Sequence, residues 1–438
     1  MKKAVKSMFL MMFIAVVISG LIACSSTENN SSPQENKKNE SQENKETTGE
    51  DVELTMWLWP GMGFSELAKE YEEQHPNIKI TIQEAEYHDN HQNLITSLAA
   101  GSGAPDIAAV DEGYLERMKE HSQHFTNLLD FGAADLKGDY LEWKWRQASN
   151  ADESFLIGIP TDVGPMAMAY RVDIFEEAGL PTNPDEVSAA LNTWDSYLEA
   201  GKKVKETTGA SMFNHIIDLF QVIREQGEKQ YFENDNTLII EESEQIKKAW
   251  DYAVKAQDIH ANIQRVDTEW GAALANGDYA TVFLPPWMLQ NIKNDAPDTS
   301  GLWNIALIPE GAGNWGGSFL TVPDQSENAK EAYEFITWLM SPENQLRIFE
   351  SNGNFPSAPS VYQSDAVQNL SDEFFNREDL GAIFSESALL VDYVYRAPHT
   401  APINQIVEEA LISIADGQAT PEEAWETAVA EVKRQVNR

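Results

Sequence analysis

Two residues in the first third of the chain combine an aromatic face with a carboxylate. Trp59 and Asp111 each stand where an apolar run that reads as a strand comes to its end. Ligands of open α/β sheets bind beyond the carboxyl ends of strands, and these residues become neighbours if the strand order is 2-1-3. An indole packs on the C–H face of a sugar ring, and a carboxylate accepts hydrogen bonds from its hydroxyls. The pair indicates a site for an uncharged sugar, with core packing as the alternative for the Trp.

Further tryptophans stand beside glycine or proline, where the backbone turns and faces the surface. A loop indole without a partner would be an apolar liability, so a ligand role is favoured most for Trp287, which follows two prolines. The remaining candidates for ligand contact in these turns, and in the first predicted strand, are Trp57, Trp270, Trp315, Gly316 and Gly317.

A further carboxylate, Asp162, lies in the turn-rich segment 158–166 between two apolar runs. This segment has the character of a link between domains. The carboxylate either accepts sugar hydroxyls or caps the next segment, and the sequence favours neither role over the other.

Metal and catalytic motifs are weak. His88 with His91 and His121 with His124 have spacings that metal sites use, but neither pair has an obvious complete ligand set, so we expect no metal and no cofactor. G-x-S-x-G, P-loop and H-E-x-x-H patterns are absent from the sequence. With 71 acidic residues a glycosidase pair can always be imagined, so carboxylates alone do not predict an enzyme.

The charge balance excludes whole classes of partner. The chain has 438 residues, with 31 Lys+Arg against 71 Asp+Glu and a formal net charge of −40. No basic face can emerge from that balance to neutralise phosphates, and an anionic membrane repels the folded body. We therefore expect no nucleic-acid partner. A hydrophobic content of 42% excludes a wholly disordered protein, and the length suits two or three domains.

The N-terminus has the features of an export signal. Three lysines precede an apolar run, Met8–Ile18, that is too short to span a bilayer. The segment that follows, Leu21-Ile22-Ala23-Cys24, resembles a lipobox. It predicts a lipoprotein signal peptide over residues 1–23 and the attachment of lipid, including palmitate, to Cys24. Residues 24–50 are polar and predict a disordered tether. We expect an extracytoplasmic protein on the outer face of the cell membrane, held there by its N-terminal lipid only.

Apolar periodicity predicts alternating strands and helices. A β-α-β-α-β series within about sixty residues indicates parallel strands with right-handed crossovers, as in doubly wound sheets. Its strands begin with the alternating Leu54, Met56 and Leu58, and near the chain's end Thr420 predicts the N-cap of a last helix. The expected segments are strands at 54–59, 78–82 and 107–110, and helices at 64–74, 94–100, 329–340, 403–414 and 421–432.

A series of short motifs occurs in a specific order along Val52–Val436. They are LTMW at 54–57, FSELA at 64–68, HPNI at 75–78, APDI at 104–107, GIP at 158–160, FEEAGLP at 175–181, TW at 193–194, LANGDYA at 274–280, PW at 286–287, GGS at 316–318, AYEFI at 332–336 and SPENQ at 341–345. In this order they resemble the extracellular solute-binding proteins of carbohydrate-uptake ABC transporters, the family 1 group that includes maltose-binding proteins.

The resemblance implies an α/β fold of the type II periplasmic-binding-protein kind, with two lobes, each a doubly wound sheet, and a ligand cleft between them. The N-terminal lobe would comprise 51–161 plus about 306–356, and the C-terminal lobe 162–305 plus about 357–438. Carried onto matching positions, the resemblance places Trp59 and Asp111 on the first lobe's side of the cleft, Asp162 and Trp315 with Gly316 and Gly317 near the crossings, and Trp287, Tyr395 and Arg396 on the second lobe's side.

The resemblance also implies a function. The expected protein is a monomeric receptor, not an enzyme, that closes on a sugar and delivers it to the permease subunits of an ABC importer. Trp-rich clefts suit an oligosaccharide, and arabino-, xylo- and gluco-oligosaccharides stay open. Asp162 stands where some members have Glu, and Arg171 where many have Asn. The alternatives are a secreted glycoside hydrolase lipoprotein and the same fold with a non-sugar solute such as a metal or a peptide.

Overall fold

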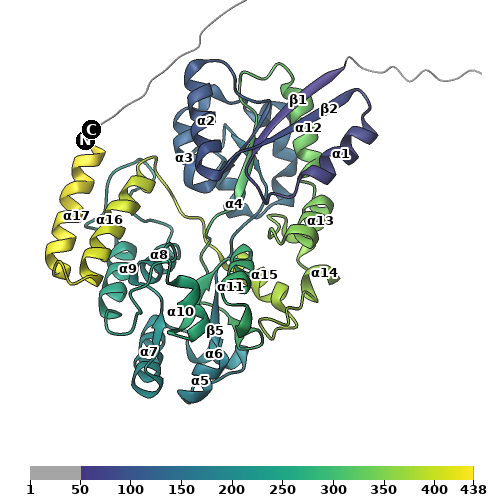
Figure 1. Cartoon of the computed structure of the whole chain (residues 1–438). Helices are drawn as coiled ribbons and strands as arrows, with labels where there is room; N and C mark the ends of the chain where they lie inside the picture. Colours follow the sequence, from purple (N-terminus) through teal and green to yellow (C-terminus); the bar gives the residue numbers. More distant parts are fainter. Residues whose placement is uncertain (1–50, 438) are drawn as a thin grey trace, which may run out of the picture. The chain divides into compact units, whose positions relative to one another are not determined.

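The computed structural model describes residues 51–437, drawn as a ribbon in Figure 1. The predicted signal peptide, the lipidation site at Cys24 and the tether lie outside the described residues. Within 51–437, no helix combines the length and the apolar character that crossing a bilayer requires.

The first sheet has five strands in the order β2-β1-β3-β9-β4. β1 pairs in parallel with both β2 and β3, so the strand order is 2-1-3, the condition under which Trp59 and Asp111 become neighbours. β9 is antiparallel to β3 and β4, because this strand enters the sheet from a later crossing of the chain. The strands are β1 Val52–Leu58, β2 Ile78–Glu84, β3 Ile107–Asp111, β4 Gly158–Pro160 and β9 Ser318–Thr321.

We call this sheet and the elements around it the first lobe. Local signals set its helix ends: α1 ends before His75-Pro76, α2 ends at Gly101 with φ of 69°, and Asp111 caps α3 by accepting from the Gly113 amide. The helices are α1 Ser65–Gln74, α2 Tyr87–Ala100, α3 Glu112–Glu120, α4 Glu142–Ala148, α12 Ala329–Leu339 and α13 Pro342–Asn352, with 3-10 turns at Ser122–His124, Leu128–Phe131 and Ala133–Asp139.

The second lobe contains a four-stranded sheet in the order β6-β7-β5-β8. β6 and β7 are parallel, and β5 is antiparallel to both of its neighbours. Side chains of β5 alternate between two buried clusters, Met168 and Tyr170 on one face and Ala167 and Ala169 on the other, so this sheet is covered on both faces. The strands are β5 Ala167–Arg171, β6 Ser211–Phe213, β7 Tyr279–Leu284 and β8 Trp303–Ala306.

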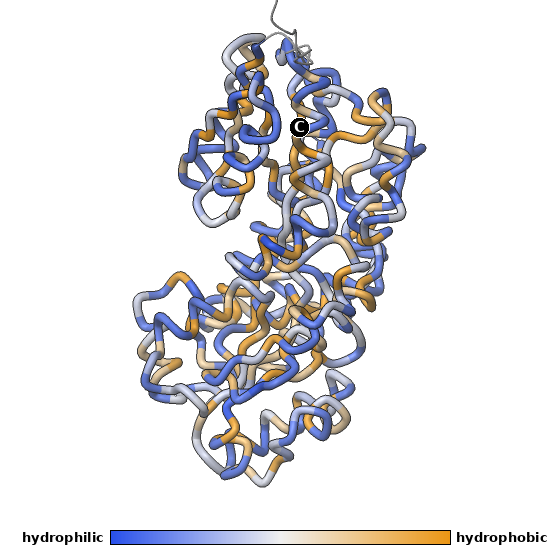
Figure 2. Tube along the Cα trace, turned by 90° about the vertical axis from the view of Figure 1, so that its right-hand side faces the viewer, coloured by the Kyte–Doolittle hydropathy of each residue, from blue (hydrophilic) through white to orange (hydrophobic). Residues whose placement is uncertain are grey.

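Helices surround the second sheet. Figure 2 shows hydrophobic segments concentrated in the interior of the second lobe, which is the lower part of the view. The capping box that Thr420 predicted is present, with Glu423 as its partner, so the expected last helix is confirmed. The elements are α5 Val172–Glu177, α6 Pro184–Ala190, α7 Trp194–Thr208, α8 Ile216–Arg224, α9 Glu244–Lys255, α10 Trp270–Asn276, η4 Pro286–Met288, α11 Leu289–Asp295, η5 Pro297–Thr299, η6 Pro359–Val361, α14 Asp365–Gln368, α15 Leu380–Leu390, α16 Thr400–Ala415 and α17 Pro421–Val436.

Three segments connect the lobes: the chain crosses after β4, again between β8 and β9, and again after α13. The first two crossings touch, since the Trp315 amide donates to the Gly164 carbonyl at 2.8 Å. A Cβ at Gly164 would lie 1.8 Å from the Trp315 carbonyl oxygen, so only glycine fits there. The second crossing matches G-x-G-x-x-G at 311–316 but opens no helix, so it does not form a dinucleotide-binding turn.

The predicted α/β fold with two lobes is confirmed, and both sheets are mixed rather than fully parallel. The residue boundaries given to the lobes stay a prediction, because the described residues all belong to one compact unit.

Candidate ligand-binding site

Two adjoining cavities lie between the lobes. The first encloses about 500 Å³ and the second about 790 Å³. Both are lined by Tyr87 and Asp111 from the first lobe, Trp287 from the second and Gly316 from a crossing. These shared residues make the two cavities one continuous cleft.

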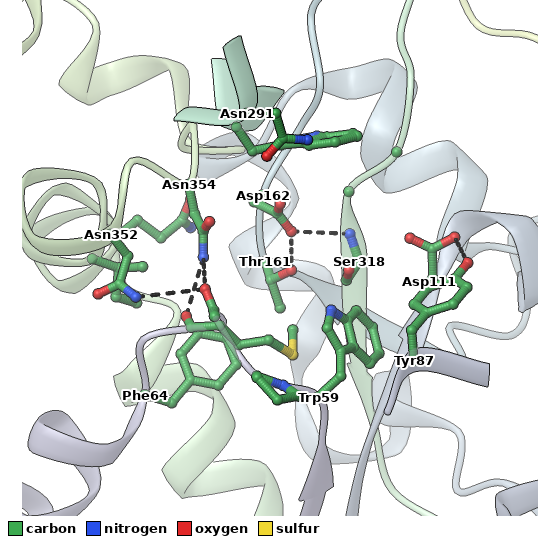
Figure 3. Close-up of a pocket in the computed structure, with 18 residues that line it drawn as sticks. Trp59, Phe64, Tyr87, Asp111, Thr161, Asp162, Asn291, Ser318, Asn352 and Asn354 are labelled. Carbon is green, nitrogen blue, oxygen red and sulfur yellow. Dashed lines mark hydrogen bonds between the residues drawn. The ribbon is translucent and has the colours of Figure 1, made fainter. Parts of the chain in front are cut away.

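Aromatic rings from both lobes form the walls of the first cavity. Trp59 follows β1 and meets the edge of Tyr87 at 5.5 Å between ring centroids. Trp287 in η4 is 39% exposed, although it is a large hydrophobic residue, and its ring centroid is 5.8 Å from that of Trp315. Figure 3 shows Trp59 and Asn291 on opposite sides of this cavity. The exposed face of an indole in the cavity suits a flat apolar surface such as a sugar ring.

Asp111 is held at the cavity wall by hydrogen bonds to one carboxylate oxygen. Its Oδ1 accepts from the Tyr87 hydroxyl at 2.8 Å (Figure 3) and from the Gly113 amide, also at 2.8 Å. Burial raises the pKa of Asp111 to about 6, and Glu112 adds to the rise. Near neutral pH the group is an acceptor whose second oxygen is available for ligand hydroxyls.

His91 fixes the backbone beneath Asp111. The Asp111 amide donates to His91 Nε2 at 3.0 Å, so the proton of the neutral ring is on Nδ1, which donates to the Tyr87 carbonyl at 2.7 Å. Burial lowers the pKa of His91 to about 4, which keeps this tautomer over the neutral range.

Asp162 supplies a second carboxylate. Its Oδ1 accepts from the Thr161 hydroxyl at 2.6 Å and from the Ser318 amide at 3.0 Å (Figure 3). Burial raises the pKa of Asp162, while Thr161 and the Lys144 ammonium oppose the rise. The hydrogen bond to Ser318 also ties the first crossing to β9.

The other polar side chains that line the first cavity are uncharged. Amide side chains from both lobes line this cavity, namely Asn291, Gln345, Asn352 and Asn354. The described lining residues include no Lys or Arg. Two carboxylates without a facing cation disfavour an anionic ligand, whereas carboxylates and amides together match a neutral ligand rich in hydroxyls.

Buried ion pairs form part of the wall of the second cavity. Glu112 Oε1 accepts from the Gly316 amide at 2.9 Å, and its Oε2 lies 2.8 Å from Asn314 Nδ2. Lys144 Nζ and Arg396 Nη1 lie 3.3 and 3.2 Å from the same Oε2. These cations are therefore already engaged by protein carboxylate.

The structure brings most of the expected candidates to the cleft. Those that line the first cavity are Trp59, Asp111, Asp162, Trp287, Gly316 and Gly317. Trp315 and Arg396 line the second cavity.

Three expected candidates line neither cavity. Trp57 shares a strand face with Trp59 but lies within β1, where its Nε1 donates to Gln83 Oε1 at 3.0 Å. Trp270 is 6% exposed and belongs to a core cluster of the second lobe. The hydroxyl of Tyr395 donates to an asparagine, Asn236, at 2.8 Å. For Trp270 the neighbouring glycine in the sequence did not distinguish a buried ring from one that lines the cleft.

Sequence reasoning missed Tyr87, His91 and Glu112. Tyr87 and His91 lie one helical turn apart on α2, a spacing that indicates one shared face. Glu112 directly follows Asp111 in the chain, and no local signal distinguishes it from the other acidic residues. Among residues 51–437, no three His, Cys, Asp or Glu side chains are grouped so that they could hold a metal ion.

Comparison with known proteins fits this geometry. A family model described as bacterial extracellular solute-binding protein matches residues 66–375. The chain belongs to this family. The resemblance that the motifs indicated is thus confirmed at the level of the family.

Several members of the solute-binding family are similar over most of their length. The arabinooligosaccharide-binding protein of Bacillus subtilis (strain 168) is 26% identical, over 99% of each chain. The lactose-binding protein of Rhizobium radiobacter is also 26% identical, over 84% of this chain and 90% of the relative. A crystal structure of an extracellular solute-binding protein of family 1 is 35% identical, with a TM-score of 0.85, over 87% of this chain and 99% of the other.

The burial of Asp111 leads to a pH-dependent prediction. With its pKa raised from 3.8 to about 6, the carboxyl contributes stability that is fully present below pH 3.8 and is lost as the pH rises through about 6. The Asp111→Asn amide does not ionise, so its free energy of unfolding relative to wild type should rise from about pH 4 to about pH 7. Denaturant titrations across this range measure the difference.

Asp152→Asn provides a control whose difference from wild type should stay nearly constant between about pH 4 and pH 7. Asp152 is exposed, and hydrogen bonds from Ser154 lower its pKa, so its carboxylate contributes stability that is present above pH 3.8 and lost on acidification. A difference for Asp111→Asn that is constant across the pH range would contradict the burial of an ionising group.

Proposed function

We propose that the protein is the receptor of an ABC importer, which captures a neutral oligosaccharide between its lobes and delivers it intact to the permease subunits. One observation carries the proposal: indoles from both lobes, Trp59 and Trp287, share a cavity with two carboxylates and uncharged amides. The names of the arabinooligosaccharide- and lactose-binding relatives support a sugar as the ligand.

Hinge closure explains how such a receptor signals occupancy. A sugar that touches Trp59 and Asp111 on one lobe and Trp287 on the other favours the arrangement in which both sets of contacts form. The three crossings allow rotation of one lobe against the other, and the closed form presents a different surface to the permease. The proposed receptor acts as a monomer, because residues of one chain line the cleft.

The N-terminus gives the receptor its location. We infer that cleavage before Cys24 and lipidation of its thiol hold the folded body at the outer face of the cell membrane. The tether of residues 24–50 then keeps the receptor near its permease and raises the effective concentration of one toward the other.

Trp287→Ala should weaken sugar binding by more than about tenfold, which needs only ~1.4 kcal/mol of lost stacking. Titration of the intrinsic Trp fluorescence with arabino-, xylo- and malto-oligosaccharides and with lactose identifies the ligand and measures its dissociation constant. The physical reason is the exposed face of this indole in the cleft.

Trp57→Ala is the matched control, since this partly exposed indole lies outside both cavities. Its dissociation constant should stay within about twofold of wild type. If the wild type and Trp287→Ala bind the same sugar with equal affinity, Trp287 does not contact the ligand.

An intact ligand separates this receptor from a glycoside hydrolase. Because the chain holds the sugar by differential contacts and releases it unaltered, prolonged incubation with the identified oligosaccharide should return it at its original chain length. Chromatography of the mixture measures this, with Asp111→Asn and Asp162→Asn as comparisons. Shorter products that disappear in both variants would establish the hydrolase instead.

The lipid anchor has its own test. Cys24→Ser removes the sole cysteine and therefore the proposed acceptor of the lipid. In the native bacterial host, this variant should move from the membrane fraction to the culture medium or the soluble fraction, with its sugar affinity unchanged. Retention of Cys24→Ser in the membrane fraction would contradict lipidation at this residue.

A further inference from the structure

One segment of the second lobe touches the first lobe at three places that no ligand contact requires. We call it the strap: residues 388–396, from the last turn of α15 to the approach of α16. Figure 1 shows α15 and α4 near each other in the middle of the molecule, and the contacts confirm that the strap meets α4 and α3.

The first two contacts are with α4. Trp143 Nε1 donates to the Ala388 carbonyl at 3.2 Å, and both residues belong to the same buried cluster. The guanidinium carbon of Arg146 lies 3.9 Å from the centroid of the Tyr393 ring, a cation–π contact at a partly exposed position. Here α4 is anchored in the first lobe by Trp145, which packs in the first lobe's core.

The third contact is an ionic bridge made by Arg396. Its Nη1 lies 3.2 Å from Glu112 Oε2 at the start of α3, and its Nη2 lies 2.7 Å from Glu225 Oε2 after α8. The side chains of both carboxylates are nearly buried, at 7% and 5% exposure. A single guanidinium therefore links a first-lobe carboxylate to a second-lobe one.

The strap itself moves with the second lobe. The Tyr395 amide donates to the Glu228 carbonyl at 2.9 Å, and Ala397 belongs to a second-lobe core cluster. Glu112, in contrast, is bound to the second crossing through the Gly316 amide. Rotation of one lobe against the other must therefore change the distances between the strap and its partners on α3 and α4.

We propose that the strap is a non-covalent tie between the lobes and that Arg396 is a positioning residue of the hinge rather than a ligand contact. The tie stabilises the arrangement in which the lobes approach each other. The tie thereby sets the population of more open arrangements in the ligand-free protein. It also sets the fraction of molecules in which both lobes can contact a ligand at once.

The energetics give the direction of the effect. Glu112 and Glu225 are desolvated in the present arrangement, and Arg396 neutralises part of their charge. With Met at position 396 both carboxylates keep another cation, Lys144 or Arg224, but lose this one. Opening the lobes returns Glu112 and Glu225 to water, so removal of Arg396 favours opening.

The test measures the distance between the lobes without any sugar, so its outcome does not depend on the proposed function. In a Cys24→Ser background, spin labels are placed at Glu73→Cys on α1 and Glu206→Cys on α7, both exposed positions. Double electron–electron resonance gives the distribution of label distances. In Arg396→Met, the population at longer distances should grow about fivefold or more relative to the parent.

Two further variants keep the test decisive. Tyr393→Ala removes the stack with Arg146, together with the packing of this ring against a buried cluster, and should shift the distribution in the same direction by less. It decides the question if Arg396→Met loses its circular dichroism signal. Arg434→Met removes an exposed arginine of α17 and should leave the distribution as in the parent. Distributions for folded Arg396→Met and Tyr393→Ala that superimpose on the parent would overturn the proposal.

Discussion

The buried carboxylate of Glu112 is the interaction on which the cleft depends. Its two oxygens accept from the Gly316 amide and the Asn314 amide group of one crossing, and they pair with Lys144 and Arg396. A carboxylate taken out of water at this position needs all of these partners to offset its desolvation. Through them, one side chain joins the first lobe, a crossing and the second lobe.

This network keeps the positive charge of Lys144 away from the ligand cavity. Lys144 is fully buried behind the first cavity, where its ammonium opposes the rise of the pKa of Asp162 and also acts on Asp111. The two carboxylates thereby face the cleft as acceptors while the cation that balances them stays out of reach. The described lining of the first cavity offers a ligand acceptors, amides and indole faces without a fixed positive charge, which matches a neutral polyol.

Close packing at the crossings imposes the second constraint. Gly317 has φ of 90°, and a Cβ there would lie 2.4 Å from the Asp162 carbonyl oxygen. Glycine allows the two crossings to lie against each other with Asp162 bonded to Ser318 beside them. The site carboxylate and the hinge therefore share the same few residues, so a change of angle between the lobes moves Asp162 as well.

Local rules determined much of this protein from its sequence. Alternating apolar residues in β1, the stop at Gly101 and the capping box at Thr420 depend on neighbours within a few positions, and the structure confirms each of them. The order 2-1-3, which brings Trp59 and Asp111 to one edge, was only a condition at the sequence level, because right-handed crossovers fix the hand of each connection and not the order of the strands.

Only the tertiary structure decided which polar and aromatic residues face the cleft. Trp57 donates to Gln83, Trp270 packs in a core cluster, and Tyr395 donates to Asn236, so none of the three lines the cleft cavities. Arg396 pairs with Glu112 and Glu225, which lie far from it in the chain. Whether a side chain is free to meet a ligand therefore depends on such contacts between separate segments. Those contacts exist only after the lobes have folded and docked, so no local pattern in the sequence records them.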